Sequence, residues 1–227
     1  KEAMDLATDT YVIHSENWIR AINVAYGAAG DTQSGLASPL EILNKWNGRS
    51  DPDALAMALY ARWQHLFRQS DGLLGIQQIL THRPIGERTR LGLLSTLAQA
   101  AQELDSRYGN VSVPWGRIHR YGREDRSWGL PGSSGDGLET LRSIYAPLDG
   151  ALYSGQSGQS CTTLVFFHNT GRVESYSATP FGQSDESDSR YFADQAESLF
   201  SLAEFKPTGY RPTPASDLRL QVTLSVP

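Results

Sequence analysis

The chain has 227 residues and a mass of 25.0 kDa, which is enough for one large hydrophobic core or for a core with a subdomain. Its 39% hydrophobic and 20% charged residues are usual for a soluble globular protein, and no apolar run is long enough to span a bilayer. The net charge of −5 and the pI of about 5.5 disfavour nucleic acid or an anionic membrane as the main partner.

The N-terminal part is predicted to be mostly helical. Apolar side chains recur at near-heptad spacing from Lys1 to about Ala25, which predicts a single helix. Gly27 to Gly35 is rich in Gly, Ala and Asp and predicts a loop. A short helix is expected from Glu41 to Trp46, because Pro39 is typical of a helix start and an Asn-Gly pair follows the last position.

Two longer amphipathic helices are expected next. Asp51-Pro52 is typical of a helix start, and four apolar residues after it fall on one face: Leu55, Leu59, Trp63 and Leu66. A second helix is predicted from Glu87 to Tyr108, with Gly109-Asn110 ending it. Its apolar face consists of Leu91, Leu94, Ala98, Ala101 and Leu104.

Val111 to Gly150 has little periodicity and is rich in Gly, Pro, Trp and Arg, so an irregular arm is expected there. Within it, Pro131–Gly137 predicts a loop and Leu138–Tyr145 a short helix. An irregular stretch of this length is unusual in a compact domain, unless it wraps another surface or lines a site.

Basic and aromatic residues alternate in the first half of this arm. They could form a nucleic-acid patch. Glu124, Asp125 and the acidic chain instead favour a loop whose arginines pair with nearby carboxylates and whose aromatic rings pack. The residues concerned are Trp115, Arg117, His119, Arg120, Tyr121, Arg123, Arg126 and Trp128.

A β-hairpin is predicted after the arm. Its strands are Cys161–Phe167 and Arg172–Ala178, and Asn169-Thr170-Gly171 supplies the tight turn. The apolar run at the end of the first strand predicts that this strand is covered on both faces. Cys161 is the only cysteine, so no intrachain disulfide can form, and we expect its thiol to be buried and inert.

The remaining C-terminal residues predict a helix, a connector and a strand. The helix is expected to start near Ser187, with Ser187 or Ser189 as its N-cap. Its apolar face consists of Phe192, Ala196, Leu199 and Ala203. Thr208–Pro214 is a Pro-rich connector. Apolar residues alternate with polar ones from Leu218 to Val226, which predicts a terminal strand.

The common catalytic motifs are absent from the sequence. It has no Gly-x-Ser-x-Gly elbow, no phosphate-binding Gly-x-x-x-x-Gly-Lys-Ser/Thr loop, no Gly-x-Gly-x-x-Gly after a strand and no His-Glu-x-x-His. The five histidines are scattered without metal-ligand spacing. No metal or cofactor is therefore expected.

Three short segments resemble one enzyme family. Gly182-Gln183-Ser184, followed by Ser189, Tyr191 and Asp194-Gln195, resembles the end of the large β-subunit of penicillin-acylase-type enzymes. These enzymes are N-terminal-nucleophile (Ntn) amide hydrolases. For Asp194-Gln195, structural hydrogen bonding is expected rather than substrate contact.

Two further segments occur in the order and spacing of that family. Trp115–Arg120 resembles the Trp-Gly-x-x-His-Arg segment of the aculeacin and acyl-homoserine-lactone acylase branch. Leu43–Gly48 resembles the family's Leu-x-x-Trp-(Asp/Asn)-Gly. The three matches together span nearly the whole chain, and in the acylase the Trp115 segment would lie over the core near the substrate side.

The resemblance implies an α+β fold that is the C-terminal portion of an Ntn αββα sandwich. Residues 1–110 would be a helical part, residues 111–150 an irregular arm, and residues 151–227 a hairpin, helix and strand of the Ntn core. The implied partners are the rest of the β-subunit and the α-subunit. Related enzymes are periplasmic or secreted, although the chain carries no signal peptide.

In this family the first β-subunit residue is the nucleophile, and its own α-amine, with a pKa near ~8, is the general base. Lys1 cannot act in this way, and the family's oxyanion Asn and neighbouring Arg would align upstream of it. Phe166 stands where some cephalosporin-acylase relatives have a Glu. No catalytic, cofactor-binding or metal-binding residue is therefore assigned. The isolated chain is expected to be an inactive fragment of an N-acyl amide hydrolase. The resemblance favours long-chain amides as substrates of that parent enzyme.

Two other interpretations stay open. The chain could be a stand-alone binding or scaffold domain that uses Trp115–Gly150 as its contact surface. Alternatively, cleavage after Ser160 could expose Cys161 as a nucleophile, although too few residues would follow it for an αββα core. A fragment should also expose apolar surface meant for the missing part.

Overall fold

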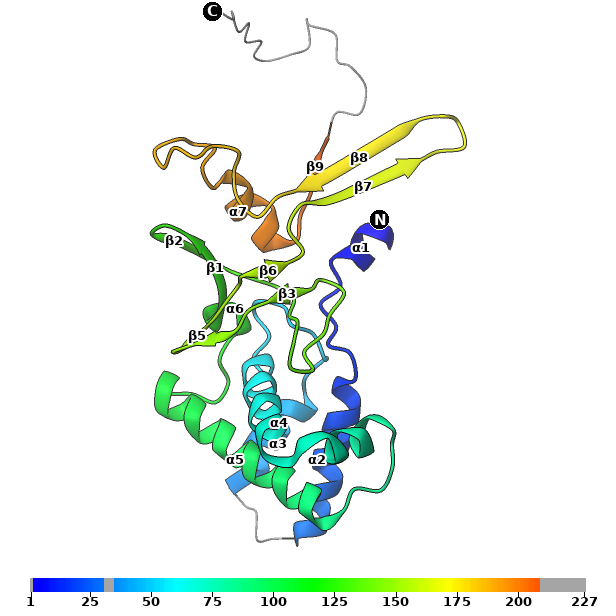
Figure 1. Ribbon diagram of the computed structural model, residues 1–227, viewed down its shortest axis with the longest axis vertical. Helices are drawn as coiled ribbons and strands as arrows, with labels where there is room; N and C mark the ends of the chain where they lie inside the picture. The colour runs from blue at the N-terminus through cyan, green and yellow to red at the C-terminus, as the bar shows by residue number, and fades with distance from the viewer. Residues whose placement is uncertain (1, 31–34, 209–227) are drawn as a thin grey trace, which may run out of the picture. The chain divides into compact units, whose positions relative to one another are not determined.

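The computed structural model describes residues 2–30 and 35–208, without the side chains of residues 71–73, and has the mixed α+β composition expected (Figure 1). It divides into two compact units. Unit 1 contains the described residues up to Ser160 together with Ser201–Ala203. Unit 2 contains Cys161–Phe200 and the described residues from Glu204. Each unit is described by itself.

Unit 1 is built on packed helices. α4 contacts both α5 and α2, and three aromatic residues meet at this contact. The ring centroid of Trp18 lies 5.9 Å from that of Trp63 and 5.3 Å from that of Phe67, both edge-on. The helices of this part are α1 Glu2–Ala7, α2 Ser15–Ala29, α3 Ala37–Asn44, α4 Met57–Leu80 and α5 Glu87–Tyr108.

The single helix predicted over residues 1–25 is wrong, because the chain leaves the helical path between α1 and α2. Val12 N–H donates to the Gly48 carbonyl at 2.8 Å, and Ser50 N–H donates to the Thr10 carbonyl at 2.9 Å. His14 then has a left-handed φ of 66° just before α2. Hydrogen bonds to a distant segment therefore override the apolar spacing.

The start predicted for the next long helix is also wrong. α4 begins at Met57, not at Asp51, and Leu55 is 52% exposed. The residues before α4 form turns because Ala54 and Pro52 accept hydrogen bonds from a segment sixty residues away in Unit 1: Trp115 N–H donates to Ala54 O and Gly116 N–H to Pro52 O. The predicted short helix corresponds to α3, which ends two residues earlier than expected.

The bounds predicted for α5 are confirmed. Gly109 ends the helix with a left-handed φ of 73°, and its N–H donates to the Asp105 carbonyl. The predicted apolar face is rotated relative to the real one, because Leu91 and Ala98 are exposed. The buried face consists of Thr89, Leu93, Leu94, Thr96, Leu97, Ala100, Ala101 and Leu104.

The stretch from Val111 to Gly150 is more regular than predicted. It holds the short helix α6 Trp115–Ile118 and most of a four-stranded sheet with the order β2-β1-β5-β4. The sheet's strands are β1 His119–Arg123, β2 Arg126–Gly129, β4 Leu148–Asp149 and β5 Leu152–Ser154, and β3 Ile144–Tyr145 pairs separately with β6 Ser157–Gly158.

The helix predicted at Leu138–Tyr145 is wrong. This segment is extended and runs beside the segment between α1 and α2: Arg142 N–H donates to the Asp9 carbonyl, and Ile13 N–H to the Glu139 carbonyl, both at 2.9 Å. The loop predicted at Pro131–Gly137 is present, with left-handed φ at its glycines.

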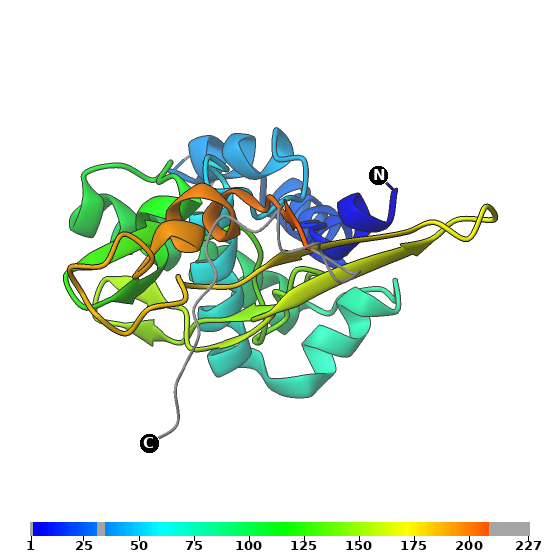
Figure 2. The same ribbon diagram turned by 90° about the horizontal axis from the view of Figure 1, so that it is seen from above.

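Unit 2 contains the predicted hairpin. β7 Thr162–Phe167 pairs antiparallel with β8 Val173–Ala178, and β9 Lys206–Pro207 pairs with the other edge of β8. Figure 2 shows the two long strands as a twisted ribbon, coloured yellow-green to gold. Gly171 has the left-handed φ of 78° that the predicted turn needs.

Three expectations for Unit 2 are wrong. Cys161 is exposed rather than buried. β7 is not covered on both faces, since Val165 is 41% and Phe167 76% exposed. The helix α7 begins at Asp194, not near Ser187, and is followed by the 3₁₀ turn η2 Phe200–Leu202. The predicted strand from Leu218 to Val226, and the connector beyond Thr208, lie outside the described residues.

Candidate functional site

The Trp115–Arg120 segment is held by backbone bonds to the turns before α4. Trp115 N–H donates to Ala54 O at 3.1 Å, and Gly116 N–H donates to Pro52 O at 2.8 Å. The indole N–H of Trp115 donates to Gly132 O at 3.2 Å, and the ring is 1% exposed. The segment therefore joins three distant parts of Unit 1.

Gly116 is required because backbones converge on it. A Cβ atom at Gly116 would lie 2.8 Å from Pro52 Cβ and 3.2 Å from Pro52 O. A Cβ atom at Gly129, in β2, would lie 2.6 Å from Gly116 O and 2.9 Å from Gly116 Cα. Real Cβ contacts essentially never fall below 3.0 Å. The glycine of this segment thus has a steric role.

His119 is a buried structural residue. Its ring is 1% exposed and stacks on Trp115 at 4.5 Å with a 9° tilt. Nδ1 lies 2.9 Å from Leu130 O, so Nδ1 carries the proton and donates to this carbonyl. Burial lowers the pKa of His119 to about 4 and keeps the ring neutral. Nε2 is buried without a hydrogen-bond partner, so His119 is not positioned as a general base for a bound substrate.

The other basic residues of this segment contact backbone and aromatic groups. Arg120 donates to Gly116 O at 2.9 Å and Ser127 O at 2.7 Å, rather than to the carboxylates expected. Arg117 lies 5.7 Å from the Tyr108 ring centroid. The aromatic residues pack as expected, with Tyr121 5.5 Å from Trp128.

The Leu43–Gly48 segment forms the turn after α3. Leu43 is fully buried, and the Trp46 indole donates to Arg49 O at 2.8 Å while its ring lies 4.8 Å from Tyr60. Gly48 has a φ of 76°, and a Cβ atom there would lie 2.7 Å from the Tyr11 ring. This segment is therefore also fixed by packing within Unit 1.

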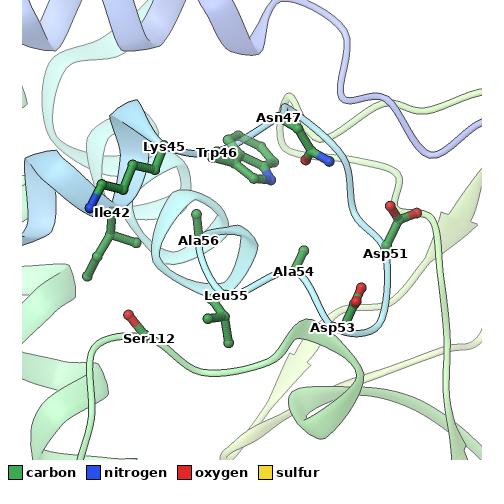
Figure 3. A pocket seen from close by; sticks show the side chains of 10 residues that line it. All are labelled: Ile42, Lys45, Trp46, Asn47, Asp51, Asp53, Ala54, Leu55, Ala56 and Ser112. Carbon is green, nitrogen blue, oxygen red and sulfur yellow. The ribbon is translucent and has the colours of Figure 1, made fainter.

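Two open grooves share Trp46 and Asn47 in their linings, and Figure 3 shows the larger of the two. The larger has a volume of about 500 Å³ and is lined by Ile42, Lys45, Trp46, Asn47, Asp51, Asp53, Ala54, Leu55, Ala56 and Ser112. The smaller, of about 400 Å³, is lined by Tyr11, Ser15, Glu16, Ile19, Arg20, Asn23, Leu43, Asn44, Trp46, Asn47 and Gly48.

The larger groove is lined by apolar and charged side chains together. Lys45 pairs with Glu41 at 2.6 Å. Asp51 accepts a hydrogen bond from Thr10 Oγ1 at 2.5 Å and lies 3.5 Å from Arg49 Nε. Ser112 is the only hydroxyl in the lining, and no histidine lines the groove beside it. The carboxylates of the lining are Asp51 and Asp53.

The Gly182–Gln195 segment is a closed loop of Unit 2. Gly182 N–H donates to Phe192 O at 3.1 Å, and Ser184 N–H donates to Tyr191 O at 3.2 Å. A Cβ atom at Gly182 would overlap Tyr191 O and lie 2.6 Å from Asp194 Oδ1. Ser189 does not cap a helix, because its Oγ accepts from Tyr191 N–H in the turn before α7. This acylase-like segment is therefore a loop that is closed by its own backbone hydrogen bonds.

Asp194 and Gln195 form the first turn of α7. Their carbonyls accept from Ser198 Oγ at 2.5 Å and from Leu199 N–H at 3.1 Å. Gln195 is 3% exposed, and its Oε1 is buried without a hydrogen-bond partner. The two residues hold the helix through their backbone, while the Gln195 side-chain oxygen has no structural bond.

Within the described residues, no group of three or more His, Cys, Asp or Glu residues could hold a metal ion. No helix between residues 2 and 208, the masked gap aside, is both long and apolar enough to cross a membrane. The sequence reasoning found the three segments by their resemblance. It missed the larger groove, whose lining comes from three separate stretches that no local pattern joins.

Two comparisons with known proteins are informative. A family model described as penicillin amidase matches residues 1–215. A search of curated proteins found no match.

Proposed function

The chain belongs to the penicillin amidase family, and on that premise we propose that it is a structural part of the β-subunit of an N-acyl amide hydrolase. In this proposal the N-terminal nucleophile, its α-amine base and the oxyanion hole lie outside residues 1–227. Residues 1–227 supply packing surface and strands to the Ntn core. The proposal's partners are the rest of the β-subunit and the α-subunit.

One observation carries this proposal. The family match extends over residues 1–215, yet each of the three acylase-like segments is used in packing its own unit. Trp115 and Gly116 bond to the turns before α4, Trp46 packs on Tyr60, and Gly182 closes a loop against Phe192. Such segments are typical of a scaffold that positions a site, not of the reacting groups themselves.

Two rival interpretations bear on the same residues. In Trp115–Gly150, Trp115, Ile118 and Leu138 belong to the core of Unit 1, while Leu141 and Tyr145 are 53% and 46% exposed, so the structure does not decide the binding-surface alternative. For the Cys161 nucleophile, Gln159 next to the cleavage point is bonded within Unit 1: its N–H donates to Ser143 O and its side chain to Ala7 O.

The substrate class and location in this proposal come from the resemblance alone. The Trp-Gly-x-x-His-Arg match favours long-chain N-acyl amides, such as acyl-homoserine lactones or lipopeptides, over aryl-acetyl penicillins. The same relatives favour a periplasmic or secreted enzyme.

The test is a paired assay. The polypeptide ending in Ser225-Val226-Pro227 is isolated from its native source, and its mass and N-terminal sequence are measured. We expect a longer subunit that begins with Ser, Thr or Cys and hydrolyses an N-acyl amide, while residues 1–227 alone release no product. Product release by residues 1–227 contradicts the proposal, and its loss in the Cys161→Ala variant would assign the activity to the Cys161 alternative.

A further inference from the structure

Asn47 and Gly48 lie in the turn after α3, at a position that both grooves share. Asn47 is exposed and lines both grooves, and Figure 3 shows it at the bend of the chain between Trp46 and Asp51. The chain has six asparagines, and only Asn47 is followed by glycine. The peptide nitrogen after an asparagine can attack the carboxamide of that asparagine, and glycine hinders this attack least because it has no Cβ.

The fold requires glycine at position 48 for a separate reason. The φ of Gly48 is 76°, and a Cβ atom added to it would approach the Tyr11 ring to 2.7 Å. The Gly48 carbonyl also accepts a hydrogen bond from Val12 N–H at 2.8 Å. A residue with a side chain would therefore be strained here, so the packing keeps the neighbour that leaves the Asn47 carboxamide most open to attack.

The hydrogen bonds of the turn leave both reacting groups free. Asn47 Oδ1 accepts from Arg49 N–H at 3.0 Å, which fixes the carboxamide in an Asx turn and draws electron density away from Cγ. Within the part of the chain that the structure describes, neither Asn47 Nδ2 nor Gly48 N–H donates a hydrogen bond. The attacking nitrogen and the leaving nitrogen are thus held by no partner among these residues.

We propose that Asn47 is a site of spontaneous deamidation in the folded chain. Gly48 N bonds to Asn47 Cγ, the Cγ–Nδ2 bond breaks, and ammonia leaves with the proton of the Gly48 amide. Water then opens the cyclic imide. Cleavage between Gly48 N and Cγ gives aspartate, whereas cleavage between Gly48 N and the carbonyl carbon of position 47 gives isoaspartate. Water is the only co-reactant, and nothing is oxidised or reduced.

Both products change the lining that the grooves share. Either carboxylate adds a negative charge to the larger groove, which already contains Asp51 and Asp53. Isoaspartate also adds a methylene to the backbone just before Gly48, which packs closely on Tyr11. Deamidation therefore makes the larger groove more negative, and the isoaspartate form also strains the turn.

Asn110 is a matched control within the same chain. It is exposed, and its Oδ1 accepts from Ser112 N–H at 2.8 Å in the same kind of turn. It is followed by Val111, whose β-branched side chain crowds the peptide nitrogen. We expect Asn47 to react at least about tenfold faster than Asn110, which corresponds to about 1.4 kcal/mol in activation free energy.

The test is incubation of the full chain at mildly alkaline pH, followed by peptide mapping with mass spectrometry. The peptide that contains Asn47 is expected to show the exchange of amide for acid first, while tryptophan fluorescence reports a folded chain. Endoproteinase Asp-N distinguishes the products, because it cleaves before aspartate but not before isoaspartate. In the Asn47→Ser variant, whose hydroxyl can still accept from Arg49 N–H, the early acidic form should be missing.

Three results would overturn the proposal. The first is conversion of Asn47 that is no faster than that of Asn110. The second is an acidic form that accumulates in Asn47→Ser as fast as in the parent chain. The third is conversion only in the urea-unfolded chain, which would show that the folded turn protects Asn47. None of these readouts uses hydrolysis of an N-acyl amide, so the proposed function can fail independently.

Discussion

Gly129→Ala tests whether the backbone convergence at Gly116 holds Unit 1 together. The atoms nearest to the added Cβ would be backbone atoms, Gly116 O at 2.6 Å and Gly116 Cα at 2.9 Å. Ordinary contact begins at 3.4 Å, so one backbone must move by about 0.8 Å. Neither glycine has a left-handed φ, so the effect isolates steric overlap from conformational strain.

The expected cost has two parts. Overpacking in a closely packed region costs typically about 1–3 kcal/mol. Displacing Gly116 also lengthens its 2.8 Å hydrogen bond to Pro52 O, which contributes about 1 kcal/mol. We therefore expect Gly129→Ala to lower the free energy of unfolding of Unit 1 by about 2–4 kcal/mol.

Tryptophan fluorescence during urea unfolding is the assay, because all five tryptophans belong to Unit 1: Trp18, Trp46, Trp63, Trp115 and Trp128. The control is Gly27→Ala, on the exposed side of α2, where a Cβ meets nothing within 4 Å. Removing a helical glycine there should raise the free energy of unfolding by about 0.5–1 kcal/mol.

The two variants are expected to move in opposite directions. A Gly129→Ala chain within about 0.5 kcal/mol of the parent, the range of ordinary surface substitutions, would refute the steric reading of the Trp115–Arg120 segment. An equal loss in Gly27→Ala would show that the chain tolerates no added methyl, and the position-specific argument would fail.

Three further perturbations probe buried or partly buried polar groups of Unit 1. The pKa of His119 is about 4 in the folded chain and near 6.5 when unfolded, so the unfolded chain binds the proton first as the pH is lowered. The free energy of unfolding should therefore fall by up to about 1.4 kcal/mol for each pH unit between pH 6.5 and pH 4. His119→Gln should remove this part of the pH dependence in urea unfolding. Gln64 is fully buried, and neither atom of its amide is hydrogen-bonded. Gln64→Leu should therefore raise the free energy of unfolding by about 1–2 kcal/mol and with it the thermal midpoint, whereas Gln77→Leu, at an exposed position, should leave both unchanged. A lower midpoint for Gln64→Leu would count against an unpaired amide. Arg62 lies 2.5 Å from Glu103 and holds the pKa of that carboxyl below its usual range, so Arg62→Met should raise the Glu103 pKa in an NMR titration, and an unchanged value would contradict the ion pair.

Elements with local signals could be predicted from the sequence. α5 was placed by its own composition and by Gly109, whose left-handed φ ends it. The β7–β8 hairpin followed from its turn residues, because Gly171 adopts the φ that the turn requires. In both elements the deciding residues lie within a few positions of the boundary that they set.

The misplaced elements are decided by distant partners. Thr10 and Val12 bond to residues near position 50, which breaks the predicted N-terminal helix. Trp115 and Gly116 hold the turns that delay the start of α4. No periodicity within the first segment carries information about these bonds, so the apolar spacing alone gave the wrong boundaries.

The candidate site shows the same division. The resemblance located the segments containing Gly116 and Gly182, but the reason for each glycine lies in the backbone it approaches, at Pro52 and at Tyr191. The expected burial of Cys161 is wrong because an apolar run does not require burial: alternate residues of the adjoining strand β7 are exposed.

The extended segment between α1 and α2 lies between two others. Thr10 and Val12 bond to Ser50 and Gly48 on one side, while Asp9 and Ile13 bond to Arg142 and Glu139 on the other. During synthesis, this segment is therefore left without these partners until residues more than a hundred positions later have been made. At about 5–20 residues per second that delay is several seconds or more, during which its backbone donors and acceptors remain open to chaperones and proteases.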